Sequence, residues 1–239
     1  MSFFQPQRFS ILPPVVKNIL IINGLLFLAT ITLSSSNIDL RQILGLYYWG
    51  SQSFETWQII THMFMHGNFT HIAFNMFAVW MFGSQLENLW GSKRFLNYYL
   101  LTGIGAAFLH YLIIHFQVLN LEYLIDNNQI SVILEKGIIP DGVAKNDARK
   151  LFSLYNTPVV GASGALFGLL IAFGLLFPNA LLMFLFLPFP IKAKYFVLIY
   201  GLIELYSGFQ NNSNIAHFAH LGGMIFGFII IKYWQSKNR

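Results

Sequence analysis

The sequence contains no cysteine, and few of its residues are charged. Without cysteine the chain forms no disulfide, has no thiolate nucleophile and offers no cysteine ligand to a metal. Charged residues make up 10% of the 239 residues and hydrophobic residues 56%, whereas an average soluble domain is roughly 25% charged. So few charged residues cannot cover the surface of a soluble protein of this size. Several apolar runs approach the roughly 20 residues that a spanning helix needs, so the composition predicts an all-α, polytopic membrane protein.

The charges also bear on partners. The formal net charge is +5, but the basic residues are scattered among loops and form no stripe, so we expect no nucleic-acid partner. No internal repeat is present, which disfavours a transporter built from duplicated halves. Glu204, inside a predicted span, is the one residue that favours transport. A carboxyl group hydrogen-bonded within the bundle is the interpretation that we favour for it.

Six membrane-spanning helices fit the apolar runs, in one domain that covers residues 1–239. The spans are expected at about 15–34, 69–90, 94–116, 161–178, 194–210 and 214–234. The serines at 34–36 leave a cleaved signal peptide as the alternative to the first span. The segment 181–189 is too short to span and is expected to be an interfacial or extended connection. The loop at about 117–160 is expected to form short amphipathic helices on the outer face.

The distribution of basic residues predicts the orientation. If the N-terminus is cytoplasmic, nine Lys and Arg residues fall in cytoplasmic segments and five in outer segments. This excess places both termini in the cytoplasm, as an even number of spans requires. We expect a multi-pass protein of the bacterial cytoplasmic membrane, because the core is compact and has no long targeting or cytosolic domain. Mitochondrial and secretory-pathway membranes are the alternatives.

Unusual polar residues lie near the outer ends of the second, fourth and sixth spans. They are His71 and Asn75 in THIAFNMF, Ser163 in GASG, and His217 and His220 in NIAHFAHLGG. These three spans would run in the same direction, and a rise of 1.5 Å per residue puts Ser163 several ångströms, and His220 ~9 Å, below the outer boundary. We therefore expect the polar groups to converge in one water-filled cavity that opens outward.

Two pairs of glycines support this convergence. Gly164 and Gly168 lie in the fourth span, and Gly223 and Gly227 in the sixth. Such pairs allow helix backbones to approach closely in a membrane. The serine hydroxyl would then lie within hydrogen-bond reach of a histidine that can accept its proton.

Donors for a developing negative charge are also expected nearby. The fourth span begins at or near Ser163, so the backbone N–H groups there have no partner within the helix. The Asn75 side chain can supply a further donor. A nucleophile, a base and oxyanion donors are the minimum set for acyl transfer.

Three segments, GASGALFG, AHLGGMIFG and HMFMHGNFTHIAFN, resemble in order and spacing the signature segments of the rhomboid family of intramembrane serine proteases. The resemblance runs from about Trp57 to the end of the chain. It implies a six-helix rhomboid-like bundle and an endopeptidase that forms an acyl-enzyme. Ser163 would be the nucleophile and His220 the base and then the acid, a dyad without a carboxylate. His71, Asn75 and the backbone at Ser163 would form the oxyanion site.

The resemblance also implies the partners. The substrates would be single-span membrane proteins, unwound near their outer end and cleaved after a small residue, and the surrounding partner is the lipid bilayer. Neither the substrate nor the oligomeric state follows from the sequence. The residues expected to support the site are Gly161, Gly164, Phe167, His217, Gly223 and Gly227.

The chain departs from the family pattern at two positions. The family often carries Trp-Arg in the first outer loop, whereas this chain has Trp57 followed by Gln58, so the usual cation that fixes the loop is missing. Phe167, one turn after the serine, can stack on the catalytic histidine but cannot donate a hydrogen bond.

Two other functions are weighed against the protease. A non-catalytic rhomboid-like protein that binds membrane helices is the first, but such relatives have usually lost the serine or the histidine, and this chain keeps both. The second is a metal or haem protein that uses His62, His66, His71 and His217. Without a second cluster at ligand spacing we expect no metal and no cofactor, and we expect His62 and His66 to hydrogen-bond at the junction of loop and helix. His217 competes with His220 as the base, and the AHLGG match favours His220.

Overall fold

The computed structural model describes residues 9–183, 189–210 and 216–237. The regular secondary structure of the described part is helical apart from an isolated bridge and a two-stranded antiparallel ribbon, in which β1 (Leu181–Leu182) pairs with β2 (Ile191–Lys192). The helices are α1 (Pro14–Ser34), α2 (Leu40–Leu44), α3 (Gln58–Thr61), the 3-10 turn η1 (His62–Phe64), α4 (Phe69–Ala78), the π-helical turn η2 (Val79–Gly83), α5 (Ser84–Trp90), α6 (Ser92–Leu124), α7 (Asn127–Lys136), α8 (Lys145–Asn156), α9 (Ser163–Leu176), α10 (Ala193–Phe209) and α11 (Ala216–Lys237).

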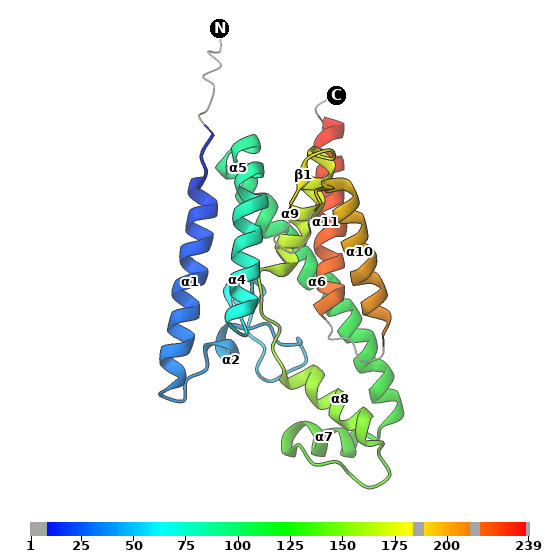
Figure 1. Ribbon diagram of the computed structural model, residues 1–239. Coiled ribbons are helices and arrows are strands. Elements are labelled where there is room, and N and C mark those ends of the chain that lie inside the picture. The colour runs from blue at the N-terminus through cyan, green and yellow to red at the C-terminus, as the bar shows by residue number, and fades with distance from the viewer. Residues whose placement is uncertain (1–8, 184–188, 211–215, 238–239) are drawn as a thin grey trace.

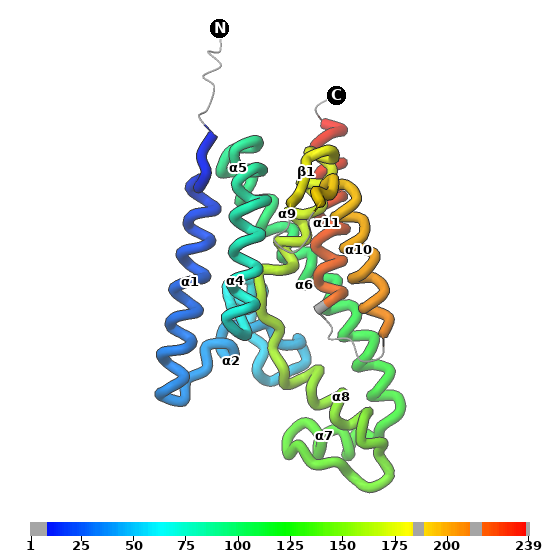
Figure 2. Tube along the Cα trace, in the orientation of Figure 1, coloured from blue at the N-terminus to red at the C-terminus, as the bar shows by residue number. Residues whose placement is uncertain are grey.

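The long helices stand side by side in one bundle (Figure 1). The start of α1 and the end of α11 lie at the same end of this bundle, and α7 and α8 lie at the opposite end (Figure 2). The helices α4, α9 and α11 run in the same direction, which brings their first turns toward one region. In this bundle α9 contacts α6, α10 and α11, as well as α4.

Helices occupy each of the six predicted spans, although residues 214 and 215 of the sixth lie outside the described part of the chain. The run from α4 through η2 to α5 fills the predicted span 69–90 without a break. However, α6 continues to Leu124, beyond the end predicted for the third span. Its extra turns bury Val118 and Leu121 in a second core, to which α8 adds Leu151 and Leu154. This contact makes further helix more favourable than a loop. Two short helices, α7 and α8, fill the rest of the predicted insertion.

The ribbon partly matches the extended connection expected at 181–189. Strand β1 covers the first two of these residues and is extended, as expected. Residues 184–188 lie outside the described part of the chain.

Large apolar side chains face outward on several helices. Leu198, Leu202 and Tyr206 of α10 and Leu25 and Leu28 of α1 are each more than half exposed. Soluble monomers rarely expose apolar patches of this extent, so these faces suit lipid. Within the described residues, α1 and α6 are long and apolar enough to cross a membrane, and α9 is apolar but has 14 residues. The count of six spans and the cytoplasmic termini stay predictions.

The closest packing in the bundle occurs where α9 meets α11. A Cβ atom placed on Gly223 would overlap the carbonyl oxygen of Gly164, and one placed on Gly227 would come within 2.7 Å of Ile171 Cγ2. The Tyr98 hydroxyl of α6 donates to the carbonyl of Gly168 at 2.7 Å, at the same contact. The absence of side chains on the glycines is therefore what allows α9 and α11 to lie this close.

A buried carboxylate fixes the start of α1. The two oxygens of Glu87 accept hydrogen bonds from the backbone N–H groups of Val15 at 2.9 Å and Val16 at 2.8 Å, and Ser92 Oγ donates to the same carboxylate at 2.6 Å. The first N–H groups of a helix have no partner within the helix, and a negative charge there is favourable. Glu87 thereby joins α1 to the end of α5.

We predict that Gly223→Ala lowers the free energy of unfolding by about 1–3 kcal/mol or more, because the added methyl group overlaps rigid backbone and no flexible side chain can move aside. Thermal unfolding of the purified protein in detergent, followed by circular dichroism, measures this. The control is Gly24→Ala in α1, where an added Cβ meets nothing within 4 Å. Equal unfolding temperatures for both variants would contradict the close helix contact.

Candidate active site

The segment that leads into α9 is held by backbone contacts. Leu46 and Val159 exchange N–H···O bonds of 2.9 and 2.8 Å, and the N–H of Gly161 donates to the carbonyl of His62 at 2.9 Å. Gly161 has φ +139°, a conformation that residues other than glycine rarely adopt. After this strained residue α9 begins at Ser163. These backbone hydrogen bonds thus hold the segment that places Ser163 at the N-terminus of α9.

The serine side chain contacts a histidine of α11. Ser163 Oγ lies 2.8 Å from His220 Nε2. The ring of His220 stacks on Phe167, with the centroids 4.2 Å apart and the planes 7° apart. Phe167 follows the serine by one helical turn, so α9 supplies both the hydroxyl and the surface that holds the histidine ring. The structure therefore brings together the residues expected to be nucleophile and base.

A carboxylate from α10 lies on the other side of these histidines. Glu204 is buried, and its Oε2 atom lies 3.0 Å from His220 Nδ1 and 2.6 Å from His217 Nδ1. From the sequence we expect Glu204 to be hydrogen-bonded within the bundle and His217 to be a neighbour of His220, but no sequence pattern connects the carboxylate to His220. The available signal was the rarity of an acidic residue inside an apolar span.

His71 lies beside the backbone that precedes the serine. Its Cε1 and Nε2 atoms are both 3.1 Å from the position that a Cβ on Gly161 would occupy, and Ser163 Oγ is 3.5 Å from that position. The N–H of Gly67 donates to His71 Nδ1 at 3.4 Å. Because Nδ1 accepts this bond, the neutral ring carries its proton on Nε2, the nitrogen near Gly161.

Asn75 follows His71 by one turn and is buried. Its Nδ2 group donates to the carbonyl of His71 at 2.8 Å. A side-chain amide has two N–H bonds, so one of them is left for a further acceptor. Of these two α4 residues, His71 lies beside the backbone that precedes the serine, and Asn75 lies one turn further along the helix.

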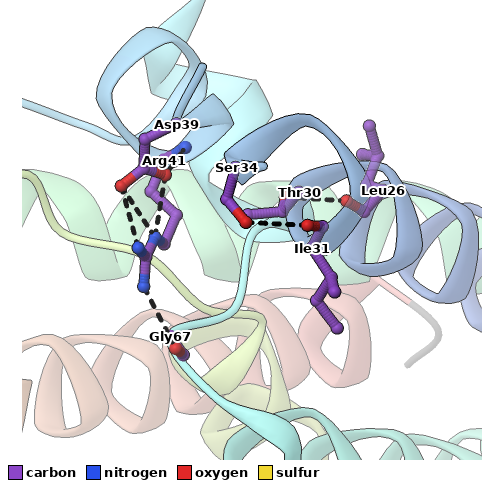
Figure 3. Close-up of polar contacts among 7 residues, drawn as sticks. All are labelled: Leu26, Thr30, Ile31, Ser34, Asp39, Arg41 and Gly67. Carbon is purple, nitrogen blue, oxygen red and sulfur yellow. Dashed lines mark hydrogen bonds and ion pairs between the residues drawn. The ribbon is translucent and has the colours of Figure 1, made fainter. Parts of the chain in front are cut away.

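Arg41 holds the turn that precedes α4. Its guanidinium pairs with Asp39, with Nη2 and Oδ2 2.8 Å apart, and Nη1 donates to the carbonyl of Gly67 at 3.2 Å (Figure 3). The hydrogen bond from Arg41 holds the pKa of the Asp39 carboxyl below its usual range. In the next residue, Asn68 caps α4 by accepting the N–H of His71 at 2.8 Å. The first loop therefore determines where α4, the helix that carries His71, begins.

Gln58 takes over the role of the missing cation in that loop. It is 1% exposed, and its Oε1 accepts from the N–H groups of Tyr47 at 3.3 Å and Glu55 at 3.1 Å. Its Nε2 donates to the carbonyls of Ile43 at 3.3 Å and Ser53 at 3.0 Å. One neutral amide thus joins four backbone groups, and the loop is fixed without a charge.

Within the part of the chain that the structure describes, the histidines before α4 are not grouped with carboxylates at the spacing of metal ligands. In the described residues, the group of three side chains able to hold a metal ion is Glu204, His217 and His220. The Nδ1–H of His62 donates to the carbonyl of Gln58 at 2.8 Å, the structural role expected for it. Burial lowers the pKa of His62 and of His66 to about 4, so both rings are neutral at physiological pH.

We predict that Gln58→Ala lowers the unfolding temperature in detergent, because it removes the partners of four backbone groups. Each buried group left without a partner costs about 1–3 kcal/mol. Gln52→Ala, an exposed glutamine of the same loop, is the control and is expected to unfold like the wild type. If the two variants unfold at the same temperature, Gln58 does not hold the loop.

Residues 53–121 and 131–236 match the family model of the rhomboid domain. The gap between the matched parts falls at the end of α6 and the start of α7, within the insertion described above. More than half of the chain is matched.

Individual relatives carry the same family name. The chain is 31% identical to Rhomboid protease GluP of Bacillus subtilis over 73% of this chain and 25% of the relative. It is 28% identical to Rhomboid protease AarA of Providencia stuartii over 73% of this chain and 54% of the relative. It is 26% identical to Rhomboid protein 1, mitochondrial, of Saccharomyces cerevisiae over 75% and 42%. The chain spans about half the length of these relatives or less.

Proposed function

Because this chain belongs to the rhomboid family, we propose that it is an intramembrane serine endopeptidase. The observation that carries the proposal is the 2.8 Å contact between Ser163 Oγ and His220 Nε2. A serine hydroxyl is a weak nucleophile until a base accepts its proton, and this contact provides the base. Both residues lie in segments that the family model matches.

The proposed reaction begins with transfer of the Ser163 hydroxyl proton to His220 Nε2 as Oγ bonds to the carbonyl carbon of the peptide. The carbonyl π electrons move to oxygen. In this proposal the backbone N–H groups at the start of α9, the remaining N–H of Asn75 and the Nε2–H of His71 stabilise this oxyanion. The C–N bond then breaks, and His220 returns the proton to the leaving amine. Water hydrolyses the resulting acyl-enzyme by the same proton transfers.

The setting of the reaction is also a proposal. We place residues 1–239 in one membrane domain with six spans and with both termini in the cytoplasm. The common end of the bundle at which α1 starts and α11 finishes supports an even number of spans, and the outward apolar faces support burial in lipid. Single-span membrane proteins are the substrates that we propose. Relatives in both bacteria and mitochondria are similar to the chain, and the bacterial cytoplasmic membrane is our choice between them.

We predict that Ser163→Ala and His220→Ala each abolish cleavage of a single-span substrate that carries small residues near its outer boundary, whereas both proteins stay folded. The measurement is the appearance of the cleaved fragment, with purified protein in detergent. The matched control is Ser131→Ala, an exposed serine of α7, which should cleave like the wild type. If only His217→Ala lost activity, the base would be assigned to the wrong histidine.

Fluorophosphonate labelling separates a missing substrate from a missing enzyme. The probe should label Ser163 of the wild type and not of the His220→Ala variant. A folded wild-type protein that the probe leaves unlabelled would point to a non-catalytic protein that binds membrane helices.

A further inference from the structure

One carboxylate oxygen in the bundle is shared by two histidines. Glu204 Oε2 lies 3.0 Å from His220 Nδ1 and 2.6 Å from His217 Nδ1. The side chain of Glu204 is 6% exposed, whereas those of His217 and His220 are 28% and 17% exposed. The oxygen is therefore enclosed by protein, and the histidines lie on the more open side.

These distances assign the protons. An ionised carboxylate accepts hydrogen bonds and cannot donate them, so each histidine must donate from Nδ1. A neutral His220 with its proton on Nδ1 has a lone pair on Nε2. That nitrogen is the atom 2.8 Å from Ser163 Oγ. The contact with Glu204 thus selects the tautomer that can accept the serine proton.

We propose that Glu204 is a positioning residue for the reaction, so that this chain works through a Ser163–His220–Glu204 triad. The proposal rests on the proposed function, because it concerns how His220 acts as a base. The family resemblance implied a dyad without a carboxylate, and the contact from α10 is the observation that departs from it. His217 supplies a second donor to the same oxygen and holds the carboxylate in place.

Glu204 acts without changing its own protonation. In the first step the serine proton moves to Nε2 and His220 becomes an imidazolium, which holds protons on both nitrogens. The carboxylate 3.0 Å from Nδ1 then faces a positive charge, and the attraction is stronger than in water because Glu204 is buried in protein. When Nε2 gives its proton to the leaving amine, the neutral imidazole with Nδ1–H is restored.

Phe167 supports the same assignment. It stacks on the face of the His220 ring and leaves both ring nitrogens to in-plane partners, Ser163 on one side and Glu204 on the other. The stacking limits the tilt of the ring but not its rotation within the plane. The carboxylate removes that remaining freedom.

Glu204, His217 and His220 together also have the ligand types of a zinc site. The geometry favours hydrogen bonds, because both nitrogens lie 2.6–3.0 Å from one and the same oxygen. A metal ion would have to stand between each nitrogen and that oxygen, which requires longer separations.

The test is Glu204→Gln in the full chain. The amide is isosteric but can offer N–H to Nδ1, which would favour the tautomer with the proton on Nε2. We expect kcat to fall by about 10²–10⁴, as for an orienting carboxylate of a serine protease, whereas KM stays within about twofold. The rate of fluorophosphonate labelling of Ser163 should fall in parallel, because labelling needs the same proton transfer and no peptide substrate.

The control is Glu135→Gln, which makes the same change at an exposed position of α7 and should leave both rates as in the wild type. Glu204→Asp is the second variant. It keeps the charge on a shorter side chain, and we expect a kcat between those of the wild type and the Gln variant. This order would not arise from a role in packing alone. If Gln prevents folding, the kcat of Glu204→Asp relative to the wild type is still measurable.

The outcomes separate this proposal from the proposed function. If the wild type cleaves and is labelled, and folded Glu204→Gln does both at the wild-type rate, the triad is wrong and the dyad stands. A lower kcat with matched loss of labelling supports the triad. If the wild type neither cleaves nor is labelled, the protease itself is wrong, and the triad with it.

Discussion

The contact between the backbones of α9 and α11 is the constraint on which the site depends. A Cβ atom on Gly223 would overlap the carbonyl oxygen of Gly164, so this position has no room for a side chain. This contact places Ser163, at the first residue of α9, within 2.8 Å of His220 on α11. A wider separation of the two helices would leave the serine hydroxyl without its base. The contact between Ser163 and His220 therefore depends on glycine, which has no side chain, at the helix contact.

The sequence predicts this part of the site because the signals are local. The glycine spacing and the depths of Ser163 and His220 can be read along single helices. The link from Glu204 depends on the rotation of α10 about its axis relative to α11, and no local pattern reports such a rotation. The length of α6 was missed for a related reason, because its last turns are stabilised by a second core that α8 completes. The hydrogen bonds of Gln58 likewise depend on how the loop folds.

Two sides of the site are built by different means. Ser163 and His220 lie on helices that pack against each other. The position of His71, by contrast, depends on a loop fixed by discrete polar contacts. Arg41 reaches the turn before α4, Gln58 joins four backbone groups, and Leu46 pairs with Val159 beside the start of α9. Helix packing thus positions the proposed nucleophile and base, and hydrogen bonding positions the loop that precedes His71.

The π-helical turn η2 lies in the middle of the run that connects His71 to Glu87. A π turn holds one more residue than an α turn, and each residue of an α-helix advances the rotation by about 100°. The residues after the turn are therefore out of phase with those before it. Asn75 donates to the carbonyl of His71 within α4, while Glu87 accepts from the start of α1. If one residue were deleted from this turn, the run would regain α-helical phase, and the two buried polar side chains could no longer serve their separate neighbours.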